Sequence, residues 1–376
     1  MLSELLHERG LTAEEFSEHA NRYAYEHGID ATLSARHVHR LASGHRADGR
    51  PLGAPRTGTR RLLEQMLGVP VDRLLKPSSA SAPEARNWSS EALELRARIS
   101  SGRNVDQQTA SLLQEKLNLT RVIDRRLGGA TLLDELRAQI NQMWQLLGDV
   151  LDHQVRARLA SVIADASTLA GWQSLDQGMV RESWEHYDKA RSAARVAESR
   201  SLEAYACAGQ AVVLLDIGDM PAALDLTDHA LDIARGHAPT FLAAWLTAAH
   251  GETLAANGRD SDSLRAFDVA ARLITDESDR ASAPYLVFDV THLTRWRGSA
   301  LARLGSREAI DVLISVLDQL DPTFTRAETA LRVDLVQALS ANGARAEVEA
   351  HAERARLLAA QIGSSRQRRR LEALIR

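Results

Sequence analysis

The sequence predicts an all-α protein in which a small N-terminal helical domain precedes a long array of helical pairs. The chain has 376 residues, is rich in alanine and leucine, and is only 4% aromatic, a composition that favours helices. Apolar residues recur at helical spacing along most of it, and many of these segments end at a glycine. From about residue 131 onwards, small and bulky residues recur with a period near 40, which is typical of repeat architectures.

The first domain, expected over residues 1–76, consists of short helices around one small core. Thr12 and Glu15 have the spacing of a capping box, so a helix begins there. Ser34 is the next candidate cap, and the helix that it opens ends at Gly44. The expected core positions are Leu2, Leu5, Leu6, Phe16, Ala20, Tyr23, Leu62, Leu63, Met66, Leu67, Val69, Val71, Leu74 and Leu75. Short helices packed in this way suit a small DNA-binding domain.

Positive charge gathers around the helix that begins at Ser34. The whole chain has a formal net charge of −4, yet the segment from Ser34 to Arg61 carries seven arginines against a single acid, Asp48. These arginines are Arg36, Arg40, Arg46, Arg50, Arg56, Arg60 and Arg61. Such a local excess is typical of a surface that faces a polyanion. The alternative is a surface helix whose basic side chains are only solvated.

The motif in this region resembles the lambda-repressor-like (Xre-type) helix-turn-helix of bacterial regulators. The pattern SxxxVxRxxSG, followed by P and then RxLLExxLG, carries the resemblance. Its residues here are Ser34, Val38, Arg40, Ser43, Gly44, Pro55, Leu62, Leu63, Glu64, Leu67 and Gly68. One feature departs from the family: the segment NRYAYEHGIDAT, residues 21–32, is longer than the tight turn that usually joins the two helices.

The resemblance implies that the helix from Ser34 is a recognition helix that enters the major groove of double-stranded DNA. Carried over position by position, the candidate DNA-binding residues are Ser34, Ala35, Arg36, His37, His39, Arg40 and Arg46. Ala35, Arg36, His37 and His39 are then expected at base edges, and Arg40 and Arg46 near phosphates.

No catalytic, cofactor or metal site is expected. His37 and His39 are two positions apart, which points their rings to different faces of a helix, and no third ligand lies nearby. The chain has no phosphate-binding GxxxxGK[ST] loop, no GxSxG and no HExxH. Cys207 is the single cysteine, so no intrachain disulfide framework can form. An enzyme is therefore the least favoured class of function.

Residues 77–130 are expected to be a linker and connecting helices. The stretch KPSSASAPEARN, residues 76–87, has the composition of a linker, and helical patterns resume over 93–99 and 105–127. These helices either set the spacing of a dimer or form the first packing pair of the repeat array.

The region 131–376 resembles the tetratricopeptide repeat (TPR). Copies of one pattern begin at Gly178, Gly218 and Gly258, and weaker ones at Gly305 and Gly343. HEAT-type helical pairs are the competing assignment, and the alanine-rich helix crossings favour a TPR-like α-solenoid. The segments LGGATLL and LAGW…D.G widen the resemblance to a group of actinobacterial, Streptomyces-like regulators with an Xre-type head and a TPR body.

A solenoid of this kind presents the first helices of its pairs along a concave groove. The candidate ligand-binding residues there are Trp172, Tyr205, Asp216, Trp245 and Glu252. Aromatic anchors beside carboxylates suit a peptide or an amine-bearing small molecule as effector. The alternative is that the aromatic residues only pack and the acids are solvated. The terminal RQRRR, residues 366–370, is interpreted as a solvated arginine face rather than a contact to nucleic acid.

These observations together predict a homodimeric transcriptional regulator that binds an operator and senses an effector. A two-fold dimer is expected because a single helix-turn-helix reads few bases. The alternative is a TPR interaction adaptor whose head does not bind DNA. The opening residues MLSELLHERG lack the apolar core of a signal peptide, and no apolar run is long enough to span a membrane, so a cytoplasmic location is expected.

Overall fold

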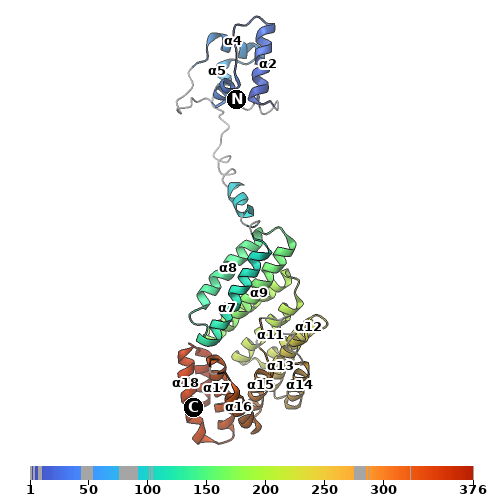
Figure 1. Ribbon diagram of the computed structural model, residues 1–376, viewed down its shortest axis with the longest axis vertical. Coiled ribbons are helices and arrows are strands. Elements are labelled where there is room, and N and C mark those ends of the chain that lie inside the picture. Colours follow the sequence, from blue (N-terminus) through green and yellow to red (C-terminus); the bar gives the residue numbers. More distant parts are fainter. Residues whose placement is uncertain are drawn as a thin grey trace. The chain divides into compact units, whose positions relative to one another are not determined.

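The computed structural model describes residues 2, 5–6, 11–43, 54–75, 92–100, 102, 105–274, 285–286, 288–321 and 323–375, and these contain helices and no strand. The chain divides into two compact units, Met1–Leu95 and Arg96–Arg376 (Figure 1). The helix expected at 105–127 as a connecting element lies in the second unit, because it packs against later helices of the repeat array.

The first unit contains four described helices around one core. They are α2 (Ala13–Glu26), α3 (Ala35–Ser43), α4 (Thr57–Leu67) and α5 (Val71–Leu74). The predicted capping box is present: the Thr12 amide donates to Glu15 Oε2 at 2.8 Å, and the Glu15 amide donates to Thr12 Oγ1 at 3.2 Å. The buried core residues are Phe16, Ala20, Ala24, Leu33, Val38, Leu41, Leu62, Leu63, Val71 and Leu74.

The connection between α2 and α3 is shorter than the sequence predicted. Residues 21–26, expected between the helices, continue α2 to Glu26. Asn21 explains this, because its side chain donates to the Leu33 carbonyl at 2.8 Å and accepts from the Leu33 amide at 2.8 Å. The turn after α2 is fastened to the helix by this reciprocal pair, and only residues 27–34 remain as the connection.

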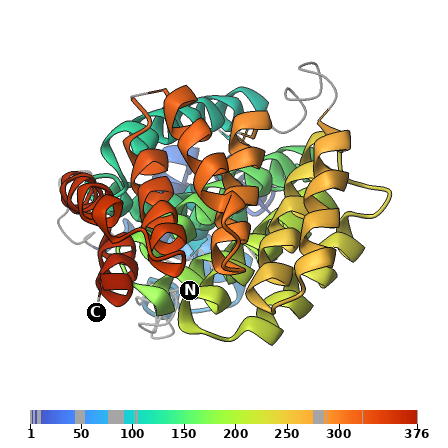
Figure 2. The ribbon, with the colours of Figure 1, turned by 90° about the horizontal axis from the view of Figure 1, so that it is seen from below.

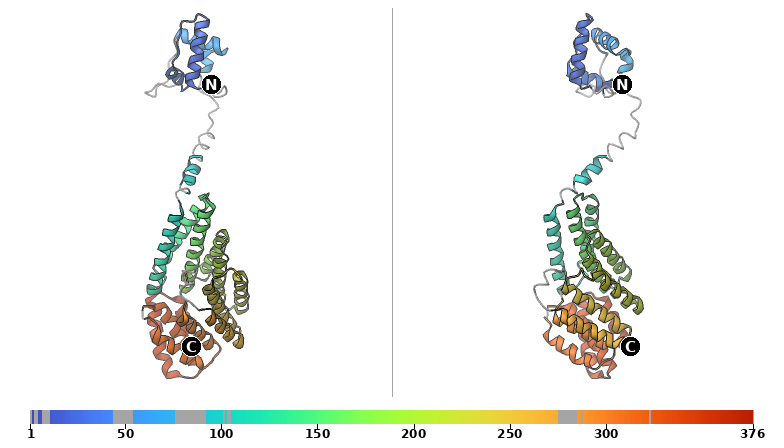
Figure 3. Two further views of the ribbon diagram at one scale, coloured as in Figure 1. Left: turned by 45° about the vertical axis from the view of Figure 1, so that its right-hand side comes forward. Right: turned by 90° about the vertical axis from the view of Figure 1, so that its right-hand side faces the viewer.

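The second unit is a stack of helical pairs. It begins with α7 (Gln107–Leu127) and α8 (Leu133–Asp149). The pairs that follow are α9 (His153–Asp176) with α10 (Val180–Val196), α11 (Arg200–Ile217) with α12 (Met220–Ala234), α13 (Thr240–Ala256) with α14 (Asp260–Leu273), α15 (Val290–Arg303) with α16 (Glu308–Gln319), and α17 (Thr325–Ala341) with α18 (Arg345–Gln361). Helix α19 (Ser365–Ile375) comes last. From α8 onwards each helix packs against the next one along the chain (Figure 3), whereas α7 packs against α9 and α17.

The five repeat glycines all lie at the turn inside a pair. Gly178, Gly218, Gly258, Gly305 and Gly343 have φ values of 84°, 89°, 69°, 72° and 75°. Residues with a Cβ rarely adopt this left-handed conformation, which is why glycine recurs here. The repeat seen in the sequence is therefore the repeat of the helix-ending turn.

At the crossing inside a pair, a bulky side chain of one helix packs on a glycine of another. Tyr187 lies against both Gly171 and Gly209, and Phe267 lies against Gly251. A serine of the second helix also binds the first: Ser183 Oγ donates to the Gly171 carbonyl at 2.7 Å, and the equivalent bond from Ser263 to Gly251 is 2.8 Å. This combination of small residues, a large ring and helical pairs is a TPR-like arrangement.

Alanine at Gly209 is expected to destabilise the second unit by about 1–3 kcal/mol, because it overpacks this crossing. A Cβ there would lie 2.5 Å from Tyr187 Cε1, and Tyr187 is buried on all sides. The matched control is Gly148→Ala near the end of α8, where a Cβ meets nothing within 4 Å. That change is expected to leave stability unchanged or raise it by up to about 1 kcal/mol. Urea unfolding followed by circular dichroism measures both, and equal midpoints would contradict the prediction.

The last helices of the array return to the first ones. Helix α17 packs against α7, and α19 packs against α9 (Figure 2). Three polar contacts join these distant segments: Arg326 with Asp124 at 2.8 Å, Arg366 with Asp216 at 2.7 Å, and Ser364 with Asp176 at 2.6 Å. The open concave groove expected from the repeat pattern is therefore closed by contacts between its two ends. We refer to these three contacts as the closing contacts.

None of the helices in the described part of the chain has the length and apolar character needed to span a membrane.

Candidate functional site

A cavity of about 360 Å³ lies inside the second unit. It is lined mainly by the first helix of each pair, together with α7 and α19. Its volume is within the range of small-molecule sites, roughly 300–1,000 Å³. The residues that give it its character are large aromatic residues, among them Trp172, Tyr205, Trp245, Tyr285 and Trp296, and seven arginines: Arg121, Arg125, Arg295, Arg303, Arg326, Arg366 and Arg370.

One wall of the cavity is aromatic. The Tyr205 ring centroid lies 4.9 Å from that of Trp245 and 4.9 Å from that of Tyr285. Trp296 extends the group, with its centroid 5.7 Å from that of Trp245 in an edge-to-face arrangement. Burial raises the pKa of Tyr205 to about 12, so its hydroxyl stays neutral. We call Tyr205, Trp245, Tyr285 and Trp296 the aromatic wall. It offers flat apolar area to a ligand ring.

A second aromatic contact lies at the closing contacts. The guanidinium carbons of Arg326 and Arg366 lie 5.8 Å and 5.6 Å from the centroid of the Trp172 ring. Both distances are within cation–π range. Trp172 therefore stabilises two of the arginines that join the ends of the array.

Four arginines, Arg295, Arg303, Arg366 and Arg370, form what we call the arginine cluster. Arg370 Nη2 lies 2.7 Å from Asp334 Oδ1, and Arg366 pairs with Asp216. Arg303 has only a distant partner, since its Nε is 3.9 Å from Glu252 Oε2. Arg295 makes no ion pair with any described residue. The cluster thus contains two arginines that are well paired and two that are not.

Burial dominates the electrostatics of this cluster. It lowers the pKa of Arg295 and of Arg303, against the attraction of nearby carboxylates. It also raises the pKa of Glu252, against the attraction of Arg303 and Arg295. The Nε atoms of Arg295 and Arg303 and the Oε1 atom of Glu252 are buried without a hydrogen-bond partner in the described structure. Such groups are costly unless a ligand or water satisfies them.

The cavity also borders a buried carboxylate network. Asp124 accepts from Gln173 Nε2 at 2.9 Å and from Arg326 Nη2 at 2.8 Å, while Asp176 lies 3.7 Å from the same Arg326 nitrogen. Burial raises the pKa of the Asp124 carboxyl, and the Arg326 guanidinium opposes that shift. Arg326 Nε and Nη1 have no hydrogen-bond partner among the described atoms. This network links a cavity residue directly to the closing contacts.

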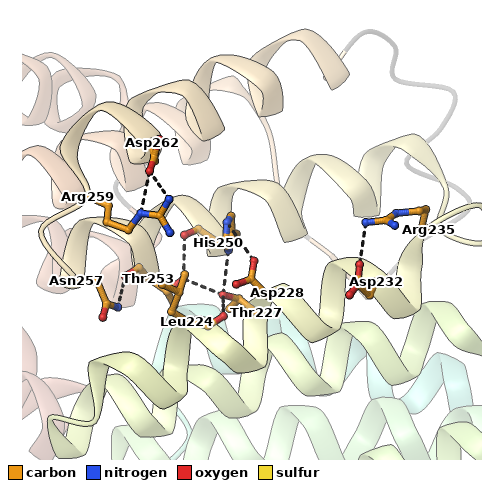
Figure 4. A network of polar contacts seen from close by, with 10 residues as sticks. All are labelled: Leu224, Thr227, Asp228, Asp232, Arg235, His250, Thr253, Asn257, Arg259 and Asp262. Atoms are coloured by element: carbon orange, nitrogen blue, oxygen red, sulfur yellow. Dashed lines mark hydrogen bonds and ion pairs between the residues drawn. The ribbon is translucent and has the colours of Figure 1, made fainter.

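The wall between α12 and α13 is held by hydroxyl groups (Figure 4). Thr227 occupies the position that a bulky ring takes in other pairs, and its Oγ1 lies 2.8 Å from Thr253 Oγ1 and 3.2 Å from His250 Nδ1. His250 Nε2 in turn lies 3.5 Å from Asp228 Oδ1. Burial lowers the pKa of His250, which favours the neutral ring. Polar bonds thus replace ring packing at this crossing.

Four of the residues predicted to bind a ligand line this cavity: Trp172, Tyr205, Trp245 and Glu252. Asp216 does not line it, because Arg366 at 2.7 Å and Arg369 at 3.6 Å engage its carboxylate. The sequence predicts carboxylates beside the aromatic rings, and Glu252 is one of them. Arginines dominate the lining, and they were missed because Arg295 and Arg303 stand alone in the sequence. The RQRRR segment did contain a signal for arginines on one side of a helix, since residues four apart share a helix face. From the sequence alone this segment is interpreted as solvated, whereas Arg366 is buried and Arg370 lines the cavity.

The candidate DNA-binding residues lie on α3 in the first unit. Val38 and Leu41 are buried in the core, whereas Ser34, Arg36, His39 and Arg40 are exposed. Ala35 and His37 are half-buried, and Arg46 lies outside the described residues. Partial burial, together with Arg40 and Arg56, lowers the pKa of His37. One face of α3 is thus fixed in the core and the other presents basic side chains.

Within the described residues, no group of three or more His, Cys, Asp or Glu side chains is placed to hold a metal ion.

No protein-family model matches this chain, and no curated protein matches its sequence. Similar solved structures include the following three. The first is a crystal structure of nearly identical TPR-like repeats from a putative kinesin light chain of Podosopora anserina, in a single-substitution variant. It has 15% sequence identity and a TM-score of 0.35, and the match covers 56% of this chain and 98% of that one. A second crystal structure of those repeats has 15% sequence identity and a TM-score of 0.33. The match covers 52% of this chain and 94% of that one. The third is the crystal structure of Bacillus thuringiensis PlcR in complex with the peptide PapR7 and DNA, with 14% sequence identity and a TM-score of 0.38. The match covers 88% of this chain and 96% of that one.

Proposed function

We propose that this chain is a DNA-binding transcriptional regulator whose second unit senses an effector. The observation that carries the proposal is the two-sided helix α3. Val38 and Leu41 fix it in the core, and Arg36, His39 and Arg40 face outward from it. An exposed basic helix on a small helical domain is the form in which many regulators read the major groove. Two copies of the chain would read a two-fold operator as a homodimer.

The closing contacts provide a means by which an effector can act. Arg326, Asp124 and Arg366 line the cavity and also join the ends of the array. A ligand that binds these side chains competes with, or reinforces, the contacts that hold α17 and α19 against α7 and α9. Its differential affinity for the closed and loosened forms would shift their populations. That shift is the signal passed to the first unit in this proposal.

Selection of duplexes from a random library by the full-length chain tests the DNA-binding role. The selected duplex is expected to be two-fold symmetric, and its affinity should fall steeply with salt as phosphate counterions are released. Fluorescence anisotropy between about 50 and 200 mM salt measures that slope, over which several phosphate contacts cost about a thousandfold or more. A chain that enriches no sequence, or that binds without salt dependence, contradicts the proposal.

An interaction adaptor is less well supported by the geometry. Adaptors of this type hold a partner segment along an open concave surface. Here the contacts of α17 with α7 and of α19 with α9 close that surface. The cavity of about 360 Å³ beside these contacts instead suits a compact ligand.

A further inference from the structure

We propose that the cavity binds a compact aromatic anion, with its ring on the aromatic wall and its carboxylate or phosphate between Arg295 and Arg303. This inference deepens the sensing role proposed above and specifies the chemistry of the effector. It depends on three features of the cavity: an excess of positive charge, unsatisfied donors at one end, and an aromatic surface beside them.

The charge excess is local and partly buried. The four guanidinium groups of the arginine cluster face the carboxylates of Asp216, Glu252 and Asp334, which leaves one positive charge uncompensated. Burial also raises the pKa of Glu252, which weakens the compensation further. A guanidinium remains protonated in proteins, so the excess cannot be relieved by losing a proton. A ligand anion is the natural complement.

The unsatisfied donors converge on one helix face. Arg295, Ser299 and Arg303 are four residues apart along α15, so they share one side of it, and all three line the cavity. Among described atoms, the Nε groups of both arginines have no acceptor. Guanidinium groups bind planar carboxylates and phosphates through paired charge-assisted hydrogen bonds. An acidic group placed here satisfies donors that the protein leaves open.

The aromatic surface begins at the next residue. Trp296 follows Arg295 and lines the same cavity, and its ring packs edge-on to Trp245, which leads to Tyr205. A ligand whose acid group lies at Arg295 therefore has a ring-sized apolar surface within reach. The volume of about 360 Å³ limits the occupant to a compact molecule or to the terminal residue of a peptide. Both of these sources present the same chemistry, an aromatic group with a nearby anion.

Isothermal titration calorimetry of the full-length chain without DNA tests the inference. The probes are indole-3-acetate, phenyl phosphate and the uncharged indole-3-acetamide, together with the tripeptide Ala-Ala-Trp with a free or amidated C-terminus. At least one anionic probe is expected to bind at least about tenfold more tightly than its uncharged counterpart, as loss of a charge-assisted contact implies. Preference for the free acid or for the tripeptide identifies the source of the anion. If no anion binds better than its uncharged counterpart, the inference is overturned.

Variants on α15 and α13 locate the site. Arg295→Gln is expected to weaken the anionic probe at least about tenfold, while Glu252→Gln, which removes a competing negative charge, strengthens it. The matched control is Arg297→Gln on the same helix: it does not line the cavity and pairs with Asp268 at 2.6 Å, so binding should not change. Wild-type affinity in Arg295→Gln, or weaker binding in Glu252→Gln, overturns the assignment.

The melting temperature without ligand separates a ligand contact from a structural role. Arg295 carries an unpaired buried charge, so Arg295→Gln should keep or raise the melting temperature while losing the shift that the anionic probe produces. A lower melting temperature with an undiminished ligand shift overturns the inference. Because these measurements contain no DNA, they can fail while the chain still binds an operator, and can succeed when it binds none.

Discussion

A chain that carries Arg36→Ala together with Arg40→Ala is expected to bind its selected duplex about a hundredfold or more weakly than the wild type. Both arginines lie on the exposed face of α3. Contacts from arginine to guanine edges or phosphates contribute about 1–3 kcal/mol each, and a dimer loses them twice. Fluorescence anisotropy at fixed salt measures the change, and a shallower salt dependence should accompany it.

The control for this experiment is Arg181→Ala in α10, whose side chain is 92% exposed and lies in the second unit. It removes one surface charge and leaves α3 intact, so DNA affinity should be unchanged. The melting temperature of the double variant should also match the wild type, because neither arginine belongs to the buried core. Unaltered DNA binding by the double variant would show that α3 is not the recognition helix.

The second large effect is expected at Asp124, where alanine should destabilise the second unit by about 3 kcal/mol or more. The change removes the nearest partner of Arg326 and leaves that cation and the Gln173 amide group without their acceptor inside the protein. Breaking one side of a buried ion pair is costly for this reason. The remaining partner, Asp176, is 3.7 Å from Arg326 and compensates only in part. Thermal unfolding measures the loss.

Asp134→Ala is the matched control for Asp124. Its ion pair with Arg137 is on the surface, with the Asp134 side chain 96% exposed, and solvent screens it, so unfolding should hardly change. Faster hydrogen exchange of α17 and α7 is expected only in Asp124→Ala, since these are the helices that Asp124 helps to join. Equal stability of the two variants would mean that the closing contacts do not hold the array.

Local signals in the sequence were sufficient for the helices and their ends. The Thr12–Glu15 capping box and the turn at Gly178 each depend on residues only a few positions apart, so periodicity and spacing reveal them. The glycine–ring crossings are nearly as local, since Gly171 and Tyr187 belong to neighbouring helices. The bond between Asn21 and Leu33 across the turn after α2, in contrast, has no sequence signature.

For the candidate ligand site, too, one part could be predicted from the sequence and another could not. Trp172, Tyr205, Trp245 and Glu252 could be predicted to face inward, because they occupy the first helices of the pairs. The positive charge of the site could not be predicted from the sequence. Arg295, Arg303 and Arg370 come from α15 and α19, and only their meeting in space turns scattered arginines into a cluster.

By itself the sequence determined a helical protein with a small N-terminal unit, a basic segment inside that unit and a repeat array behind it. Those properties follow from helix propensity, apolar periodicity and glycine placement, all of which act over short distances. Only the tertiary structure decided that the two ends of the array meet and that arginines line the cavity between its helices. The contact between Asp124 and Arg326 spans 202 residues, and Ser364 reaches Asp176 across 188. Contacts at such separations form because the superhelix returns upon itself, and no local pattern in the chain records where it will do so.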